Sequence, residues 1–394
     1  MAKKERLIKV VIVNKFGPFD KDITGKSLWQ LGQYLQSNEC NITYVCVRES
    51  IKSNAPGTAR DSSARVKYVP RISLGNNSLA RLISSMLECK FLFWRSLFTA
   101  ADVMIVMSAP PMMNWFGIWL KRFRPRRRFI FWTMDMYPEA FVASGLVKET
   151  SSLFRYLHRI IYKNPPNALI ALGERQLAYL LENYQKNIPS IVLPCGIKQV
   201  TASKDTPVWI HEEDKYKIKF CYAGNLGEAH DENFIIELAR LLDPAKHRFY
   251  INLYGTKADR VLQVIERLPV VQKISFLPYE QMQQLDIHVA SLQSQWDHVC
   301  VPSKAVSAIC AGAVLLLNSS NRCDAWHMFN EASYWINQNE ADYENAISHF
   351  LSTVRMDDIR QKQMVSARLA TMLQLKQEKA FNDAAALIHE AINT

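Results

Sequence analysis

The sequence predicts an α/β protein built from two Rossmann-like domains. Short runs of β-branched and other apolar residues alternate with longer segments of helical periodicity, which is the pattern of parallel α/β units. The alternation stops at a polar, irregular segment, residues 196–215, and starts again after it. A chain of 394 residues is long enough for two domains. We therefore expect one domain at residues 1–196 and a second at residues 216–375.

In the first half, strands are expected where short apolar runs are bounded by turn residues, and helices where apolar residues recur every three or four positions. The expected strands are Lys9–Val13, Ile42–Val47, Val66–Val69, Val103–Met107, Phe129–Thr133, Ala168–Leu172 and Ser190–Leu193. The expected helices are Ser27–Ser37, Ser78–Thr99, Met113–Phe123, Ser151–Lys163 and Glu174–Tyr184.

The second half repeats this alternation and closes on a long helical segment rich in Ala, Leu, Gln and Lys, Asp357–Asn393. The expected strands are Lys217–Ala223, Phe249–Tyr254, Ile274–Phe276, Ile287–Leu292, Val314–Leu317 and Tyr334–Ile336. Two helices, Glu232–Leu242 and Ala305–Ala311, follow the first and fourth of these strands.

The composition is that of an ordinary globular protein, with 48% hydrophobic and 22% charged residues, and it excludes a disordered chain. The eight cysteines form no C-x-x-C pair, and several lie inside apolar runs. We expect reduced core thiols in a cytoplasmic protein, without a disulfide framework or a zinc site. No secretory leader is expected at the N-terminus. Ala101–Leu120 has the length of a membrane span, but Asp102 and Pro110-Pro111 favour a buried strand, a loop and a helix start.

The net charge of +11 is unevenly distributed, because the whole basic excess lies within residues 1–200. A one-sided positive field suits an anionic partner, which for this chain is a membrane surface, a nucleic acid or a phosphorylated substrate.

The first candidate for ligand binding is the turn after the expected strand Lys217–Ala223. Gly224, Asn225 and Gly227 form a glycine-containing turn, and a helix starts at Asp231. Glycines allow backbone N–H groups to approach a phosphate, and the start of a helix favours negative charge. The alternative interpretation is a plain strand–turn–helix corner.

The second candidate is the sequence Pro302-Ser303-Lys304, which leads into the helix Ala305–Ala311. Ser303 suits the N-cap position, and Lys304 falls in the first turn, where a cation opposes the helix dipole. An anion between the lysine and the helix start would remove that conflict. The alternative interpretation is a solvated lysine.

The third candidate follows the strand Phe129–Thr133, which ends close to Asp135 and Glu139. Ligands of open α/β sheets bind outside the carboxyl ends of the strands, so Asp135 is expected to face a cleft. The alternative role for Asp135 is that of a helix N-cap.

Together these segments, in this order, resemble the GT-B glycosyltransferases. They are most similar to the family 4-like group that builds bacterial polysaccharides, including acetamido-sugar transferases with a V-P-S-K motif. Gly25 and Lys26 lie in a segment similar to that group's first, acceptor-side loop, and Phe131–Glu139 resembles its D-x-Y-P segment. Tyr222–Gly227 is similar to its YAGN-x-G segment, and Val301–Gly312 to its donor motif.

The resemblance implies a GT-B fold, with two Rossmann-like domains facing each other across a cleft and residues 376–394 as a helix packing back on the first domain. It implies transfer of a sugar from a nucleoside diphosphate sugar, UDP-linked, to a glycan acceptor that is lipid-linked, without a metal or other cofactor. Asp135 and Glu139 are then the expected catalytic residues, with Asp135 a general base if the enzyme inverts. The expected donor-binding residues are Gly224, Asn225, Gly227, His230, Pro302, Ser303 and Lys304.

The chain departs from the family pattern at charged positions. The Arg and Lys that contact the diphosphate in typical members align with Asn225 and His230, and the two donor-side glutamates align with Val299 and Ser307. Neutralisation of the diphosphate would therefore depend on Lys304. These departures keep two alternatives open, a non-catalytic sugar-nucleotide-binding or scaffold protein and, less favoured, a sugar-nucleotide epimerase.

A dense basic run, Lys121–Arg128, is the main candidate for a membrane patch, with Arg124, Arg126, Arg127 and Arg128 as its core. Together with the aromatic segment Phe91–Arg95 it is expected to rest on the anionic inner face of the membrane, which would make the protein a peripheral one. The alternatives are a solvated loop beside a core helix and, as a partner, nucleic acid, for which no binding module is recognised.

Overall fold

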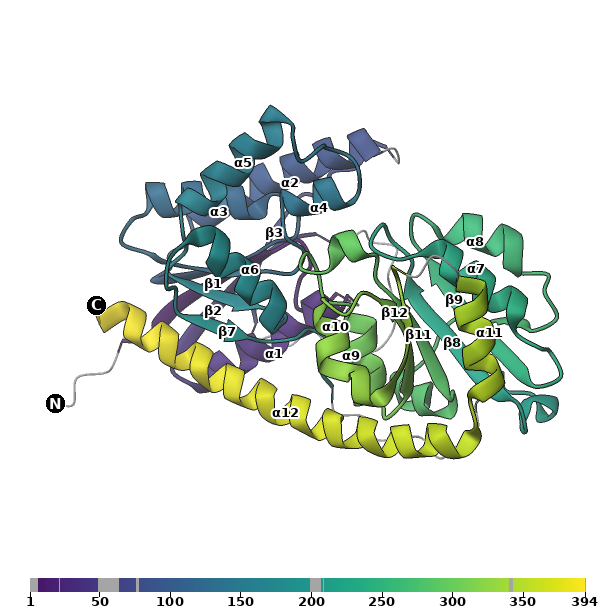
Figure 1. Cartoon of the computed structure of the whole chain (residues 1–394). Helices are drawn as coiled ribbons and strands as arrows, with labels where there is room; N and C mark the ends of the chain where they lie inside the picture. Colours follow the sequence, from purple (N-terminus) through teal and green to yellow (C-terminus); the bar gives the residue numbers. More distant parts are fainter. Residues whose placement is uncertain are drawn as a thin grey trace. The chain divides into compact units, whose positions relative to one another are not determined.

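The chain folds into two compact units (Figure 1). In this computed structural model, the described residues are 6–20, 22–48, 64–75, 78–198, 207, 209–339 and 343–393. Unit 1 comprises Met1–Cys195 and Gln377–Thr394, and unit 2 comprises Gly196–Lys376. Each unit contains one parallel sheet with helices on both faces, so the expected two-domain α/β fold is confirmed.

The sheet of unit 1 has the strand order β3-β2-β1-β4-β5-β6-β7, and all its neighbouring strands are parallel. This is the Rossmann order extended by one strand, with the direction of winding reversed between β1 and β4. The strands are β1 (Ile8–Asn14), β2 (Cys40–Val47), β3 (Arg65–Val69), β4 (Val103–Met107), β5 (Arg128–Trp132), β6 (Ala168–Ala171) and β7 (Ser190–Val192).

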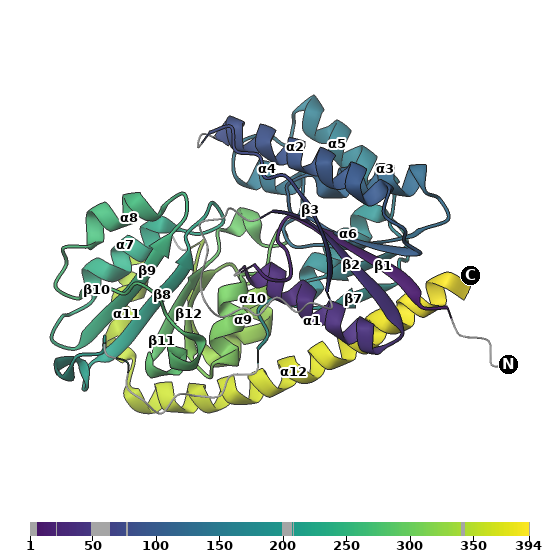
Figure 2. The same cartoon turned by 180° about the vertical axis from the view of Figure 1, so that it is seen from behind.

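Four helices, α2, α3, α5 and α6, follow one another along one face of this sheet, and each contacts the next (Figure 2). Helix α1 covers the other face, as right-handed crossovers on either side of the switch require. The helices of unit 1 are α1 (Ile23–Ser37), α2 (Ser78–Leu97), α3 (Met113–Phe123), α4 (Glu139–Ala143), α5 (Ser152–Lys163) and α6 (Glu174–Tyr184).

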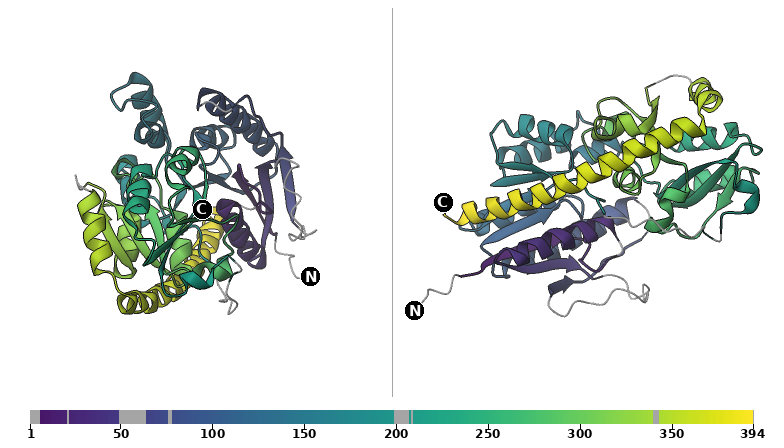
Figure 3. Two further views of the ribbon diagram at one scale, coloured as in Figure 1. Left: turned by 90° about the vertical axis from the view of Figure 1, so that its right-hand side faces the viewer. Right: turned by 90° about the horizontal axis from the view of Figure 1, so that it is seen from below.

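The long helix α12 (Met356–Asn393) starts in unit 2 and ends in unit 1 (Figure 3). Its last part packs against α1: the rings of Tyr34 and Phe381 have their centroids 5.4 Å apart, and the Tyr34 hydroxyl donates to the side-chain oxygen of Asn382. The end of the chain is therefore part of the unit formed by its beginning.

The sheet of unit 2 has the order β10-β9-β8-β11-β12-β13 and is also fully parallel, so it repeats the Rossmann order. Its strands are β8 (Ile218–Asn225), β9 (His247–Tyr254), β10 (Val271–Lys273), β11 (Ile287–Ser291), β12 (Val314–Ser319) and β13 (Ser333–Asn337). Its further helices are α7 (Glu232–Leu241), α8 (Ala258–Ile265), α9 (Ser303–Cys310), α10 (Asp324–Phe329) and α11 (Tyr343–Thr353). Helices α7, α8 and α11 share one face, and α9 and α10 the other.

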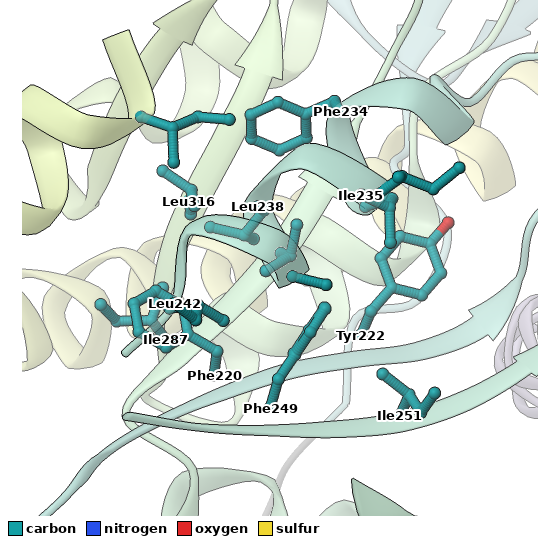
Figure 4. Packing of buried hydrophobic residues seen from close by; sticks show 14 of the residues in the cluster. Phe220, Tyr222, Phe234, Ile235, Leu238, Leu242, Phe249, Ile251, Ile287 and Leu316 are labelled. Carbon is teal, nitrogen blue, oxygen red and sulfur yellow. The ribbon is translucent and has the colours of Figure 1, made fainter. Parts of the chain in front are cut away.

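The core of unit 2 between β8, β9 and α7 is filled by aromatic and branched aliphatic side chains (Figure 4). Phe220, Tyr222, Phe234 and Phe249 are completely buried. Burying side chains of this size contributes about 1.5–3 kcal/mol each. The end of β8 and the start of α7, where the candidate site lies, are therefore held by dense packing.

Two expected elements differ from the structure by more than two residues at a boundary. The strand expected at Ile274–Phe276 lies just before it, at Val271–Lys273, because the side-chain amide of Asn252 donates to the carbonyls of Ile274 and Ser275 and so ends the ladder. Helix α1 begins before the expected Ser27, because Asp22 caps it by accepting from the backbone N–H of Thr24 at 2.8 Å.

The expected interdomain segment 196–215 is described only in part, because residues 199–206 and 208 lie outside the described residues. Its charged run ends on Asp214, which is buried in unit 2. The Asp214 carboxylate is paired with Lys217 at 3.1 Å and with Arg248 at 2.8 Å, and it accepts from the Tyr250 hydroxyl. These contacts lower the pKa of Asp214 against the effect of its burial. The end of this segment is therefore anchored in unit 2.

Candidate functional site

The candidate site of unit 2 lies at the topological switch point, where the strand order reverses between β8 and β11. The loop after β8 is bonded to the end of β11. The backbone N–H of Asp231 donates to Ser291 Oγ at 3.1 Å, and His230 Nδ1 lies 2.5 Å from the carbonyl oxygen of Ser291. These two hydrogen bonds join the loop after β8 to the end of β11 across the switch point.

The glycine turn leaves room for a ligand. Gly224 has a φ of +133°, and a Cβ atom at this position would meet nothing within 4 Å. Asp231 caps α7 by accepting from the N–H groups of Asn233 and Phe234, so the expected helix start is confirmed. The turn therefore offers open backbone next to the start of α7, which suits the close approach of a phosphate.

The loop between β9 and α8 is hydrogen-bonded to this turn. Leu226 donates its N–H to the Tyr254 carbonyl at 2.6 Å, and Lys257 donates its own N–H to the Leu226 carbonyl at 3.1 Å. The Lys257 ammonium donates to the His230 carbonyl at 2.7 Å and pairs with Glu232 at 2.6 Å. Gly255 and Lys257 are not among the site residues expected from the sequence. The signal was present, since Tyr254-Gly255 repeats the strand–glycine–helix pattern of the first turn.

Replacing Gly255 by alanine should loosen the glycine turn. The φ of Gly255 is +110°, and an added Cβ would lie 2.9 Å from the Leu226 carbonyl oxygen and overlap the Asn225 side chain. We expect a loss of about 1–3 kcal/mol in unfolding free energy, measured by urea titration. Gly312→Ala is the matched control, because Gly312 has a φ of +76° but nothing within 4 Å of the added atom. Equal losses in both variants would contradict a role of the close approach.

Lys304 connects the start of α9 to the glycine turn. Its ammonium donates to the Tyr222 hydroxyl at 2.5 Å and to the Asn225 carbonyl at 2.9 Å, and it lies 4.2 Å from the centre of the Tyr222 ring. Burial lowers the pKa of Lys304 to about 7. Lys304 is therefore held by Tyr222 and the glycine turn, so it is not the freely solvated side chain of the alternative interpretation.

The helix that carries Lys304 is capped differently from the expectation. Helix α9 begins at Ser303, its N-cap residue is Pro302, and no side-chain hydrogen bond caps it. Pro302 has an extended conformation with a ψ of 101°, which moves the cap one position back. The expected N-cap role of Ser303 is therefore wrong, and the start of α9 keeps N–H groups without a side-chain cap.

The positions aligned with the family's donor-side glutamates hold no carboxylate. Ser307 is buried, accepts from the Tyr279 hydroxyl and donates to the Gly196 carbonyl at 3.3 Å. Val299 is a buried core residue. Gly196 lies so close to α9 that an added Cβ would come within 3.0 Å of the Ser303 carbonyl oxygen and the Ser307 hydroxyl. A neutral hydroxyl network therefore stands at the position that aligns with one of the family's donor-side glutamates.

In unit 1, Asp135 follows β5 at the carboxyl edge of the sheet, and its neighbours are fixed. The Met134 N–H donates to Ser108 Oγ at 2.8 Å, and Gln176 donates to the Met134 carbonyl at 3.0 Å. The Asp135 side chain is exposed, but the surrounding atoms desolvate its carboxyl and, with the negative charge of Asp22, raise its pKa to about 6. The N-cap interpretation of Asp135 is wrong, since Pro138 precedes α4.

Glu139 is the first residue of α4, and its side chain contacts α5. Its carboxyl is buried, accepts from the Tyr162 hydroxyl at 2.7 Å, and has His158 Nε2 at 3.7 Å. Burial raises its pKa to about 7, although the Tyr162 hydrogen bond acts in the opposite direction. A cavity of 810 Å³ opens above Tyr162 and His158 between α5 and α6. The Glu139 carboxyl of α4 is therefore held by Tyr162 of α5.

Gly25 and Lys26, the expected acceptor-side residues, lie in the first turn of α1. A Cβ at Gly25 would overlap the Gly17 carbonyl oxygen, so this glycine allows the helix to pack against the loop after β1. Lys26 is exposed. The α1 start also contains Asp22, whose charge acts on Asp135, so both expected elements lie at the same edge of the sheet.

The basic run, which spans the end of α3 and the segment after it, is exposed only in part. Arg124 and Arg126 are exposed, whereas Arg127 and Arg128 are half-buried, and Arg127 donates to the Ser96 carbonyl at 3.2 Å. Beside this run lies a continuous aromatic surface on α2 and α3, in which neighbouring rings contact one another. We call it the aromatic surface, and its exposed members are Trp94, Phe98, Trp119 and Phe123.

In the parts of the chain that the structure describes, no group of three His, Cys, Asp or Glu side chains could hold a metal ion. Within the same residues, no helix has the length and apolar character needed to cross a membrane. All eight cysteines lie in the described residues without a disulfide between them, and seven of them are buried, in agreement with the expected core thiols.

The comparisons with known proteins bear on the fold. No protein-family model matches the chain, and no curated protein matches it. A structure described as trehalose-6-phosphate from E. coli bound with UDP-2-fluoro glucose is similar with a TM-score of 0.67 at 12% identity, covering 96% of this chain and 99% of the other. The sucrose-phosphate synthase of Thermosynechococcus elongatus gives a TM-score of 0.67 at 12% identity, with 97% of both chains covered.

A third similar structure is WaaG, a glycosyltransferase involved in lipopolysaccharide biosynthesis. Its TM-score is 0.62 at 14% identity, with 97% of this chain and 99% of that chain covered. Together with the two parallel sheets, these similarities define the fold of the chain as the two-domain, Rossmann-like GT-B fold.

Proposed function

We propose that the protein is a glycosyltransferase of the family 4-like group that moves a hexosyl group from a UDP-linked sugar to a lipid-linked glycan acceptor. Cell-surface polysaccharide assembly at the cytoplasmic side of the membrane is the process that this activity would serve. Two of the similar structures carry related chemistry in their descriptions, a bound UDP-2-fluoro glucose and a transferase of lipopolysaccharide biosynthesis.

The observation that carries the proposal is the position of Lys304. A cation held at 2.9 Å from the carbonyl of the glycine turn, in the first turn of α9, lies where two helix starts favour an anion. Departure of a nucleoside diphosphate adds negative charge in the transition state, and a preorganised cation with backbone N–H groups stabilises that charge. Lys304 and the Gly224–Gly227 turn would supply these groups.

Asp135 would act on the acceptor side as the general base that takes the proton of the attacking hydroxyl group. Its raised pKa, about 6, lies close enough to neutrality for proton transfer while leaving the carboxylate ionised at pH 7. Glu139 would have a supporting role, because its carboxyl is buried against Tyr162.

A direct experiment is a calorimetric titration with UDP-glucose, UDP-N-acetylglucosamine and GDP-mannose, followed by an assay for release of the nucleoside diphosphate. We expect one of these sugar nucleotides to bind at micromolar to millimolar concentration, the usual range of enzyme substrates. Binding without any turnover, with or without added membrane lipids, would favour the non-catalytic alternative. That alternative rests on the missing charges at Asn225, His230 and Ser307.

The membrane part of the proposal rests on the aromatic surface and the exposed cations beside it. Aromatic side chains favour the interface between lipid and water, and basic residues are attracted to anionic head groups. Arg122, Arg124 and Arg126 are exposed next to Trp119 and Phe123. This arrangement suits an anionic leaflet, which is where a lipid-linked acceptor would be found.

Replacing Arg122 and Arg126 by glutamate should weaken binding to anionic vesicles. Each basic residue near such a surface contributes about 1 kcal/mol, so the double variant should bind at least tenfold more weakly at low salt. Vesicle sedimentation with phosphatidylserine-containing liposomes measures this. The control is the same charge change at Lys376 and Lys379, two exposed residues of α12. Equal sedimentation of both variants would remove the membrane proposal.

A further inference from the structure

His230 occupies the position that aligns with the family's diphosphate-binding lysine. A hydrogen bond of its ring, however, makes it a neutral hydrogen-bond acceptor in place of a cation. Its Nδ1 atom lies 2.5 Å from the carbonyl oxygen of Ser291 at the end of β11. A carbonyl oxygen can only accept a hydrogen bond, so Nδ1 must carry the hydrogen. The β11 strand therefore selects one tautomer of this ring.

The surroundings of the ring also keep it uncharged. Burial lowers the pKa of His230 well below its ordinary value, and the cations of Lys304 and Lys257 lower it further, against the Ser291 hydrogen bond. The ring packs edge-to-face against Tyr222, whose hydroxyl accepts from Lys304. Among the described residues, no carboxylate is one of the groups that shift the pKa of His230.

A neutral imidazole with its hydrogen on Nδ1 presents a lone pair at Nε2. Within the described parts of the chain, Nε2 of His230 has no hydrogen-bond partner. Nε2 is also absent from the set of buried polar atoms without a partner, which means that the atom is accessible and open to a ligand. An acceptor atom repels the oxygens of an ionised diphosphate, whereas it attracts a hydroxyl group. His230 thus requires a hydrogen-bond donor from the ligand.

We propose that Nε2 of His230 accepts a hydrogen bond from a hydroxyl group of the sugar nucleotide whose diphosphate is held at Lys304. The inference rests on the proposed function, because it assumes a sugar nucleotide in the site of unit 2. Two residues then contribute to binding in different ways. Lys304, a cationic hydrogen-bond donor, holds the diphosphate, and His230, a neutral acceptor, selects for a hydroxyl group. That hydroxyl belongs either to the transferred sugar or to the ribose, and the two sources differ in their test.

The test begins with the free protein, labelled with ¹⁵N in its histidines. Long-range ¹H–¹⁵N spectra distinguish a ring nitrogen that carries hydrogen from one that does not, and the His230→Gln variant assigns the signals. We expect Nδ1 with hydrogen and Nε2 without it at pH 7. Hydrogen on Nε2 in the free protein would overturn the inference, whatever the protein binds.

The second step adds the sugar nucleotide that binds best among UDP-glucose, UDP-N-acetylglucosamine and GDP-mannose. The Nε2 signal should move in the direction of hydrogen bonding and remain without a directly bound hydrogen. An unchanged Nε2 signal at saturation, or a doubly protonated ring, would overturn the inference and leave the proposed function in place. Failure of all three compounds to bind would instead overturn the proposed function, and the inference with it.

The third step locates the hydroxyl group by calorimetry. His230→Ala should weaken binding of the sugar nucleotide about five- to tenfold, the size of one net hydrogen bond. If the hydroxyl belongs to the transferred sugar, the nucleoside diphosphate alone binds the variant and the wild type equally. If it belongs to the ribose, the nucleoside diphosphate loses the same affinity for the variant as the sugar nucleotide does. The 2′-deoxy nucleoside diphosphate then binds both proteins equally. His349→Ala, at an exposed histidine of α11, is the control, and equal affinities of both variants for every ligand would overturn the inference.

Discussion

Asp135→Asn is expected to lower the turnover number by about 10²–10⁴-fold, the usual effect of removing a general base. The substitution keeps the shape of the side chain but removes its ability to take the proton of the acceptor hydroxyl. Affinity for the sugar nucleotide should be unchanged, because the proposed donor site lies in unit 2 and Asp135 in unit 1. Nucleoside diphosphate release at saturating donor and acceptor measures the effect.

The pH profile gives an independent readout of the same residue. Because the carboxylate must be ionised and its pKa is raised to about 6, kcat/KM of the wild type should fall as the pH drops below 6. Asp22→Asn is the matched control: it removes the neighbouring negative charge that raises this pKa, so the fall should move to lower pH while the plateau is retained. Turnover of Asp135→Asn within tenfold of the wild type would contradict the base role.

Lys304→Met is expected to weaken sugar-nucleotide binding by about 2 kcal/mol, or roughly 30-fold, the scale of a charge-assisted hydrogen bond. Methionine keeps much of the chain length but cannot neutralise the diphosphate, and neither Asn225 nor the neutral His230 supplies a cation in its place. Calorimetric titration measures the loss. Lys246→Met, at an exposed lysine of unit 2, is the control, and equal affinities of the two variants would contradict the prediction.

The affinity of the wild type should also depend on pH through Lys304. Its pKa is lowered to about 7, so the free protein carries this charge below pH 7 and loses it above. A diphosphate favours the protonated form, so above pH 7 binding must take up a proton, and Kd should rise up to tenfold per pH unit. The Kd of Lys304→Met should not show this rise between pH 7 and 9.

Much of the fold follows from local patterns. The helix Met113–Phe123 and the strand Val103–Met107 have the expected bounds, because each pattern has a definite period or a run of buried residues bounded by turn residues. The alternation of strands and helices then leads to parallel sheets, since a parallel connection requires a crossover. The strand at Val271–Lys273 was misplaced because a distant side chain, Asn252, decides where it ends.

The candidate site could be predicted as a set of segments but not as an arrangement. The sequence located the glycine turn, Lys304 and Asp135 near strand or helix ends, because turn and cap residues act locally. It also placed Glu139 beside Asp135, since only three residues separate them. In the structure the Glu139 carboxyl turns to Tyr162, 23 positions further along, because burial of a carboxyl group requires a hydrogen-bond donor.

The sequence by itself determined that this chain is a two-domain α/β protein with its candidate ligand groups at the carboxyl ends of strands. Only the tertiary structure decided what those groups are chemically. Lys304 contacts Tyr222 and the glycine turn across about 80 positions of sequence, and His230 receives its tautomer from a strand end 61 positions away. The order of strands in the sheet brings these atoms together. Charge, tautomer and pKa depend on that neighbourhood, and no local pattern in the sequence specifies it.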